Sequence, residues 1–203
     1  MRGKRKRFGK FVIGMAGLLG GVLSVRDSDS LLAAGYVLPD TGQTQCYQNR
    51  YQGAMECPKP GERFHGQDGN YQGRQPAYRD NGDGTVKDLN TGLMWQQDDA
   101  QNTTTAYSWP SAGDYCTTLS LAGHTDWRLP SVSELVSLIY YPGGGTPTIN
   151  TAYFPGCLAD FYWSETTYAM QTDYAWGVYF GYANLGYGDK SYAYYVRCVR
   201  GGL

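Results

Sequence analysis

Charged side chains are scarce in this chain of 203 residues, because Asp, Glu, Lys and Arg together make up only 17% of it. So little charge excludes a long coiled coil, and a 41% share of hydrophobic residues excludes an intrinsically disordered chain. Residues 1–35 hold seven of the 17 basic residues and two of the 18 acidic ones. The rest of the chain therefore carries 10 basic and 16 acidic residues, a net charge of −6. Because nucleic acids attract cationic surfaces, we expect no nucleic-acid partner.

Histidine and the common catalytic motifs are also missing. The only histidines are His65 and His124, and neither stands in a metal-binding motif. The chain has no Cys-x-x-Cys pair, no Gly-x-Ser-x-Gly turn, no His-Glu-x-x-His helix and no phosphate-binding loop. We therefore expect no bound metal, no cofactor and no catalytic residue, and we expect that the protein is not an enzyme.

No apolar run reaches the roughly 20 residues that a membrane-spanning helix needs. The longest, residues 11–25, has 15 residues and follows a basic stretch over residues 2–10. This pattern is typical of a secretory signal peptide, and Ala33, Ala34 and Gly35 offer small residues for cleavage. We predict a signal peptide over residues 1–35 and an exported protein, extracellular or on the cell surface, with the periplasm as an alternative. An uncleaved membrane anchor is the alternative interpretation of the apolar run.

Cysteine usage agrees with export, since an oxidising compartment favours disulfides. Cys46 and Cys57 flank a short polar loop, which predicts a local bond. Cys116 and Cys198 would join the middle of the chain to its end. Cys157 is then left over, either as a buried free thiol or as a bond to a second chain.

Secondary-structure patterns predict an irregular extension over residues 36–74 and a folded domain over residues 75–203. Two helices are indicated, and Ser131 with Glu134 forms a capping-box pattern at the start of the second. Short strands and long loops make up the rest, so we expect the α+β class. The expected helices span 110–119 and 131–141, and the expected strands span 85–88, 93–95, 161–164, 175–180 and 194–200.

A calcium-binding loop is suggested by the alternating Asp, Asn and Gly residues of Asp80-Asn81-Gly82-Asp83-Gly84. Arg79 and Asn90, however, stand where such a loop needs its first and last acidic ligands. We therefore interpret this stretch as a polar hairpin turn.

Tyrosine is abundant towards the end of the chain, with nine of the 19 tyrosines between residues 162 and 195. Strict alternation along a strand would bury Trp176, Val178 and Phe180 and expose the residues between them. A surface of Tyr, Gly, Ser, Asn and Asp has the composition of an antibody paratope. The competing interpretation is an ordinary aromatic core with glycine turns. The predicted ligand-binding residues are Gly177, Tyr179, Gly181, Tyr182, Asn184, Tyr187, Asp189, Ser191, Tyr192 and Tyr194.

Five short motifs in order resemble the Lcl C-terminal-like domain family. They are residues 80–86 (DNGDGTV), 91–95 (TGLMW), 126–130 (DWRLP, with Glu134-Leu135), 162–164 (YWS) and 195–201 (YVRCVRG). The resemblance implies a C-type-lectin-like fold, related to that of formylglycine-generating enzymes. It also implies extracellular ligand binding, with no known reaction.

The interleaved tail is also similar to the variable region of a protein diversified by a retroelement, in which Tyr, Gly, Ser, Asp, Ala and Asn are common outcomes. Two departures limit the resemblance. The calcium motifs of carbohydrate-binding lectins are missing, and Cys198 stands alone where formylglycine-generating enzymes use a pair of cysteines. We therefore predict an exported adhesion or ligand-binding protein whose ligand is a protein or glycan on another cell, virus or surface. The alternatives are an enzyme of the formylglycine-generating type and a structural envelope or adhesin component.

Overall fold

A computed structural model describes residues 39–48, 53–71, 73–98, 105–142 and 145–201. The predicted signal peptide and its cleavage site lie outside these residues. No helix in the described part of the chain is both long and apolar enough to cross a membrane. The elements are β1 (Cys46–Tyr47), β2 (Ala54–Met55), η2 (Asp68–Asn70), β3 (Tyr78–Asp80), β4 (Thr85–Asp88), β5 (Met94–Gln96), α1 (Trp109–Thr118), α2 (Val132–Val136), β6 (Phe161–Thr167), β7 (Tyr174–Tyr179), β8 (Asn184–Asp189) and β9 (Val199–Arg200).

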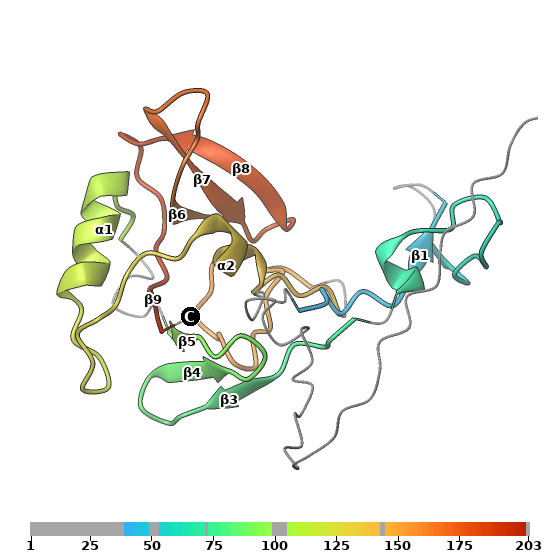
Figure 1. Cartoon of the computed structure of the whole chain (residues 1–203), viewed down its shortest axis with the longest axis horizontal. Helices are drawn as coiled ribbons and strands as arrows, with labels where there is room; N and C mark the ends of the chain where they lie inside the picture. The colour runs from blue at the N-terminus through green and yellow to red at the C-terminus, as the bar shows by residue number, and fades with distance from the viewer. Residues whose placement is uncertain (1–38, 49–52, 72, 99–104, 143–144, 202–203) are drawn as a thin grey trace, which may run out of the picture. The chain divides into compact units, whose positions relative to one another are not determined.

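The class is α+β, as the sequence predicted, with two α-helices and small antiparallel sheets among the described residues. One sheet has four strands in the order β3-β4-β5-β9, so the end of the chain pairs with its middle. A second has three strands in the order β6-β7-β8 (Figure 1). Strands β1 and β2 form a separate two-stranded ribbon.

The stretch between β3 and β4 is a polar turn, as expected. An Asp80 carboxylate oxygen accepts the N–H of Gly82 at 2.7 Å. An Asp83 oxygen accepts both the N–H and the hydroxyl of Thr85 at 3.1 and 2.6 Å. The two carboxylates therefore stabilise the turn by accepting hydrogen bonds from its backbone N–H groups, as Asp side chains commonly do in turns.

Helix α1 lies one residue from its predicted position and buries Ala112 and Cys116. Helix α2 begins as predicted, with the Ser131 and Glu134 side chains each accepting the other's backbone N–H. It is shorter than expected, because α2 ends at Val136 and the chain continues in tighter turns. Leu138 donates its N–H to Leu135 and Ile139 to Val136, three residues back instead of four.

Two hydrophobic cores support these elements. The first joins the four-stranded sheet to α2 and the three-stranded sheet through buried Trp95, Leu135, Phe154 and Val178. The second lies under α1 and contains Trp127, Trp163 and the pair Cys116 and Cys198.

The structure contains both expected disulfides, Cys46–Cys57 and Cys116–Cys198. Cys157 is buried outside both disulfides, and its Sγ donates to the Leu158 carbonyl at 3.6 Å. The long bond ties α1 to the segment that precedes β9, as its position in the second core requires.

The predicted strand over residues 194–200 is only partly regular. Strand β9 is limited to Val199–Arg200, and Tyr194 and Tyr195 make single bridges to Tyr107 and Tyr162. The buried guanidinium of Arg197 explains the interruption, because it donates to the carbonyls of Gln96 and Gln97 at 2.8 and 2.6 Å.

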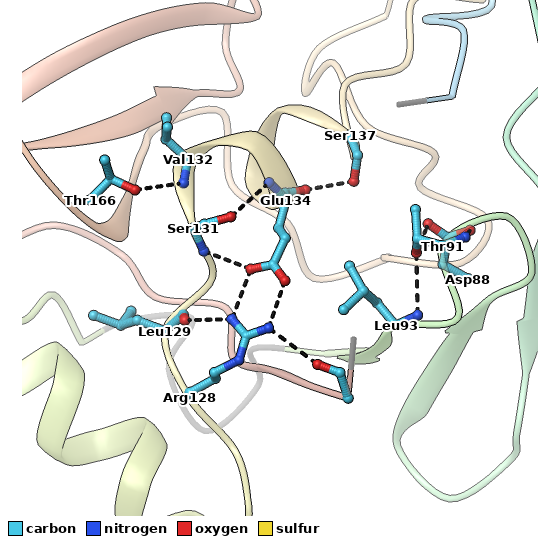
Figure 2. Close-up of polar contacts among 11 residues, drawn as sticks. Asp88, Thr91, Leu93, Arg128, Leu129, Ser131, Val132, Glu134, Ser137 and Thr166 are labelled. Atoms are coloured by element: carbon cyan, nitrogen blue, oxygen red, sulfur yellow. Dashed lines mark hydrogen bonds and ion pairs between the residues drawn. The ribbon is translucent and has the colours of Figure 1, made fainter. Parts of the chain in front are cut away.

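A half-buried ion pair holds the start of α2. Arg128 donates to both carboxylate oxygens of Glu134, at 2.8 and 2.6 Å, and to the carbonyl of Gly201 at 3.2 Å (Figure 2). The same Glu134 carboxylate accepts the N–H of Ser131 at 2.7 Å. The motif of residues 126–130 therefore has a structural role, because Arg128 connects the cap of α2 to Gly201 near the end of the chain.

Candidate binding surface

Both faces of the three-stranded sheet pack against other parts of the chain, one of them only in part. Strand alternation places Trp176, Val178 and the ring of Tyr162 on the face that packs against α2, which we call the α2 face. The opposite face carries Trp163, Ala175 and Gly177 and packs towards α1, and we call it the α1 face. The predicted binding residues divide between these two faces and the loops.

The α1 face is closed by aromatic rings lying on glycines. A side chain at Gly177 would meet the Tyr162 carbonyl oxygen at 2.3 Å and the Phe161 ring at 2.5 Å. A side chain at Gly188 would meet the Tyr194 ring at 2.6 Å. Gly177 was predicted to face solvent, but it is buried because only a glycine lets the Phe161 ring lie on this strand.

Tyr194 was also predicted to bind ligand, and the structure places it mainly against other rings. Its ring centroid lies 4.6 Å from that of Phe161 and 4.9 Å from that of Trp163. Burial raises the pKa of its hydroxyl, and the nearby Tyr192 adds to the effect. Gly181 is likewise buried, under the ring of Tyr179. These residues support the sheet, and their contact with solvent is limited.

Beyond the part covered by α2, the α2 face carries an aromatic patch, which we define as Tyr168, Tyr174, Trp176 and Tyr187. Tyr168 and Tyr187 stack with centroids 4.4 Å apart and planes 4° from parallel. Trp176 meets both rings edge-on, at 5.2 and 5.6 Å. Tyr174 meets Tyr187 in the same manner at 5.9 Å.

Trp176 was predicted to be a core residue, and this prediction was wrong. It is only partly buried, whereas Val178 on the same face is fully buried. The five-residue helix α2 is too short to extend over the whole face, so the rings at residues 168, 174, 176 and 187 cover one another instead. Tyr187 stays 50% exposed.

The other predicted binding residues lie at opposite ends of β8. Tyr179, Tyr182 and Asn184 surround the β7–β8 turn, and Tyr182 is 72% exposed. Asp189, Ser191 and Tyr192 lie at the far end, about 17 Å away for a strand of this length. The predicted binding residues therefore do not form one continuous surface. Of these residues, Tyr187 belongs to the aromatic patch.

Asp189 is engaged within its own turn. One carboxylate oxygen accepts the hydroxyl of Ser191 at 2.7 Å and its N–H at 2.9 Å. The Ser191 hydroxyl and N–H together hold the pKa of Asp189 below its ordinary value. Asp189 is thus a turn-forming anion beside the patch.

The segment that contains the patch is acidic. Residues 158–195 contain four acidic side chains, at positions 160, 165, 173 and 189, and one basic side chain, Lys190. The Lys190 ammonium lies 4.1 Å from the centroid of the Trp109 ring and donates to the Thr167 hydroxyl at 3.0 Å. Two exposed apolar residues, Met170 and Leu185, lie on the β6–β7 loop and on β8.

Sequence reasoning missed Tyr168, Tyr174 and Trp176 as members of the candidate site. The signal was present, because alternation puts Trp176 on the same face as its β8 neighbour Tyr187. It was overlooked because the pattern of the glycine-rich β8 does not suggest a strand. Strand propensity is low in Asn184–Asp189, and pairing with β7 forms this strand nonetheless.

Groups of three or more His, Cys, Asp or Glu side chains that could hold a metal ion do not occur among the described residues. Comparison with known families finds that residues 84–200 match the model described as the Lcl C-terminal domain. No curated protein matches the chain.

Proposed function

Because the chain belongs to the Lcl C-terminal domain family, we propose that it is an exported surface protein that binds a ligand through the aromatic patch and is not an enzyme. The fold proposed with it is the C-type-lectin-like one. Export is supported by the signal-like pattern of residues 1–35 and by two disulfides, which persist in oxidising compartments.

The observation that carries the proposal is the aromatic patch itself. Four rings pack edge to face and face to face on the α2 face of the sheet, and half of Tyr187 meets solvent. Rings held by one another lose little further freedom when a ligand arrives, so binding costs less entropy. Such rigid aromatic side chains are typical hot spots of recognition surfaces.

The surroundings favour a protein ligand over a glycan. Met170 is 83% exposed and Leu185 is also exposed, and such aliphatic side chains suit apolar protein surfaces. Two acidic groups lie beside Tyr174 of the patch, Asp173 in the chain and Asp189 across the β7–β8 ladder, and they complement basic side chains on a partner. Arginine can also stack on exposed aromatic rings. We therefore propose a partner surface that combines apolar and basic residues.

The non-enzymatic part of the proposal is supported by Cys198. This cysteine occupies the C-terminal segment in which formylglycine-generating enzymes carry their catalytic thiols. Here its sulfur is bonded to Cys116 in the buried core, so it presents no thiol to a substrate.

Diversification of the tail remains a proposal that the neighbouring DNA can test. A reverse-transcriptase gene beside a near-copy of the last codons would support it. The packing at Gly177 predicts that this position tolerates no change even if Tyr182 and Tyr192 vary freely.

Selection on the immobilised full chain tests the proposed function. A phage-displayed random peptide library and a glycan array serve as probes, with the Trp176→Ser variant as the counter-selection target. We expect the selection to enrich peptides that contain Arg and apolar residues, and we expect these peptides to bind the wild type but not the Trp176→Ser variant. Enrichment of glycans alone would overturn the protein-ligand proposal, and peptides that bind both proteins equally would overturn the role of the patch.

A further inference from the structure

The three-stranded sheet has one open edge. The outer side of β6 is occupied, because Trp163 donates its N–H to the Tyr195 carbonyl at 2.9 Å and Tyr195 donates to Phe161 at 3.0 Å. On the other side the sheet ends at β8, which pairs only with β7 among the described strands (Figure 1). A strand with one unpaired side is a ready template for another strand.

The alternation of hydrogen bonds along the β7–β8 pair shows which residues of β8 direct their N–H and C=O groups towards the open edge. Lys190 donates its N–H to the Asp173 carbonyl at 2.8 Å, in register with the β7–β8 ladder. Antiparallel pairs alternate between bonded and non-bonded, so Gly188, Gly186 and Asn184 also direct their N–H and C=O groups at β7. Leu185 and Tyr187 therefore direct theirs away from the sheet, towards the open edge.

The central residues of β8 carry none of the usual edge guards. Natural proteins usually guard an edge strand with a lysine, a proline or a bulge. Residues 184–188 contain no charged residue and no proline, and the register with β7 is continuous through all six pairs. Leu185 is 52% exposed and Tyr187 50%, so the edge also carries apolar side chains on one face.

We propose that β8 pairs with β8 of a second copy of this chain, antiparallel and about a two-fold axis at Gly186. In this register Leu185 lies opposite Tyr187 of the partner subunit, and the outward N–H and C=O groups of both are satisfied. Each aliphatic side chain meets an aromatic ring, a favourable cross-strand pair. Gly186 forms the close, non-bonded pair at the axis, where Cα atoms approach to about 4.5 Å.

Charge favours a second copy as the occupant. The register puts Asp189 opposite Ala183 of the partner subunit, so no like charges face each other along the strand. Directly opposed residues of an antiparallel pair share a face, so both aromatic patches lie on the same side of one six-stranded sheet. Such a dimer presents two ligand sites together, and linked sites raise avidity without new contacts. The proposal is independent of which ligand the patch binds.

Sedimentation of the purified full chain and three variants tests the pairing. Leu185→Pro removes an outward N–H that β7 does not use, and proline is tolerated on edge strands in that position. Leu185→Lys places at the edge the charged residue that commonly protects such strands. Met170→Lys is the matched control, because it adds the same charge at an exposed apolar residue away from the edge. Thermal unfolding of each variant establishes that the monomer still folds.

We expect a concentration-dependent dimer for the wild type and for Met170→Lys. At the concentration where the wild type is half dimeric, both Leu185 variants should sediment as monomers. Amide exchange read by NMR should slow with concentration at Leu185 and Tyr187, whose N–H groups the second copy would bond. A monomeric wild type, or Leu185 variants that fold and dimerise like the wild type, would overturn the proposal.

Discussion

Arg128 and Glu134 meet through two hydrogen bonds of 2.8 and 2.6 Å at the first turn of α2. The pair is unequal in exposure, since the Arg128 side chain is 35% exposed and that of Glu134 12%. Burial by itself would raise the pKa of Glu134, but the Arg128 guanidinium and the Ser131 N–H outweigh it and hold this pKa below its usual value. The helix cap, the ion pair and the end of the chain are therefore one connected unit (Figure 2).

Glu134→Gln should destabilise the fold by about 1–2 kcal/mol at pH 7, less than for a fully buried pair because solvent screens Arg128. A lowered pKa in the folded state gives stability that is present above the unfolded value of 4.5 and is lost as the pH falls through the folded value. The difference between wild type and Glu134→Gln should therefore shrink below pH 4.5. Urea unfolding at several pH values measures it. A difference that stays constant down to pH 3 would contradict the role given to this carboxylate.

Gly177→Ala should cost about 1–3 kcal/mol, because the added methyl group meets the Tyr162 carbonyl and the Phe161 ring. The matched control is Gly113→Ala in α1, where nothing lies within 4 Å of the added atom. That change should stabilise the protein by about 0.5–1 kcal/mol, since alanine is the better helix former. Thermal unfolding of the two variants compares them. Equal melting temperatures would show that Gly177 is a surface residue after all.

The two disulfides should contribute unequally. The Cys116–Cys198 bond closes a loop of 82 residues and should stabilise the fold by about 4–5 kcal/mol in the chain-entropy model. The Cys46–Cys57 bond closes a loop of 11 residues and should stabilise the segment that contains it by about 3 kcal/mol. Double Cys→Ser variants and non-reducing peptide mapping check both values and pairings. A peptide that links Cys157 to Cys198 would refute the assignment.

Local signals predicted the parts of the fold in which sequence and packing agree. The Ser131 and Glu134 pattern located the start of α2, and the turn at Asp80 located the hairpin of β3 and β4. The end of α2 could not be read in the same way, because tighter turns after Val136 keep the same side chains buried. Strand β8 was missed because its glycines lower strand propensity, yet those glycines make room for the rings of Phe161 and Tyr194.

The candidate site was only partly predictable for the same reason. Composition identified a tyrosine-rich segment, but it could not separate Tyr194, which packs on Phe161 and Trp163, from Tyr187, which lies in the patch. Alternation alone put Trp176 inside. Its position depends on how far α2 extends over the sheet, and that is a property of tertiary packing.

The central claim is that the aromatic patch binds the ligand, and the affinity of a selected peptide for Tyr187→Ser tests it most directly. Tyr71→Ser is the matched control, because Tyr71 is a similarly exposed tyrosine, at 57%, outside the tyrosine-rich segment. Isothermal titration of the full-length proteins should give a dissociation constant at least about tenfold weaker for Tyr187→Ser, as expected for a hot-spot tyrosine. Tyr71→Ser should bind like the wild type. Unchanged affinity in a folded Tyr187→Ser variant would contradict the claim.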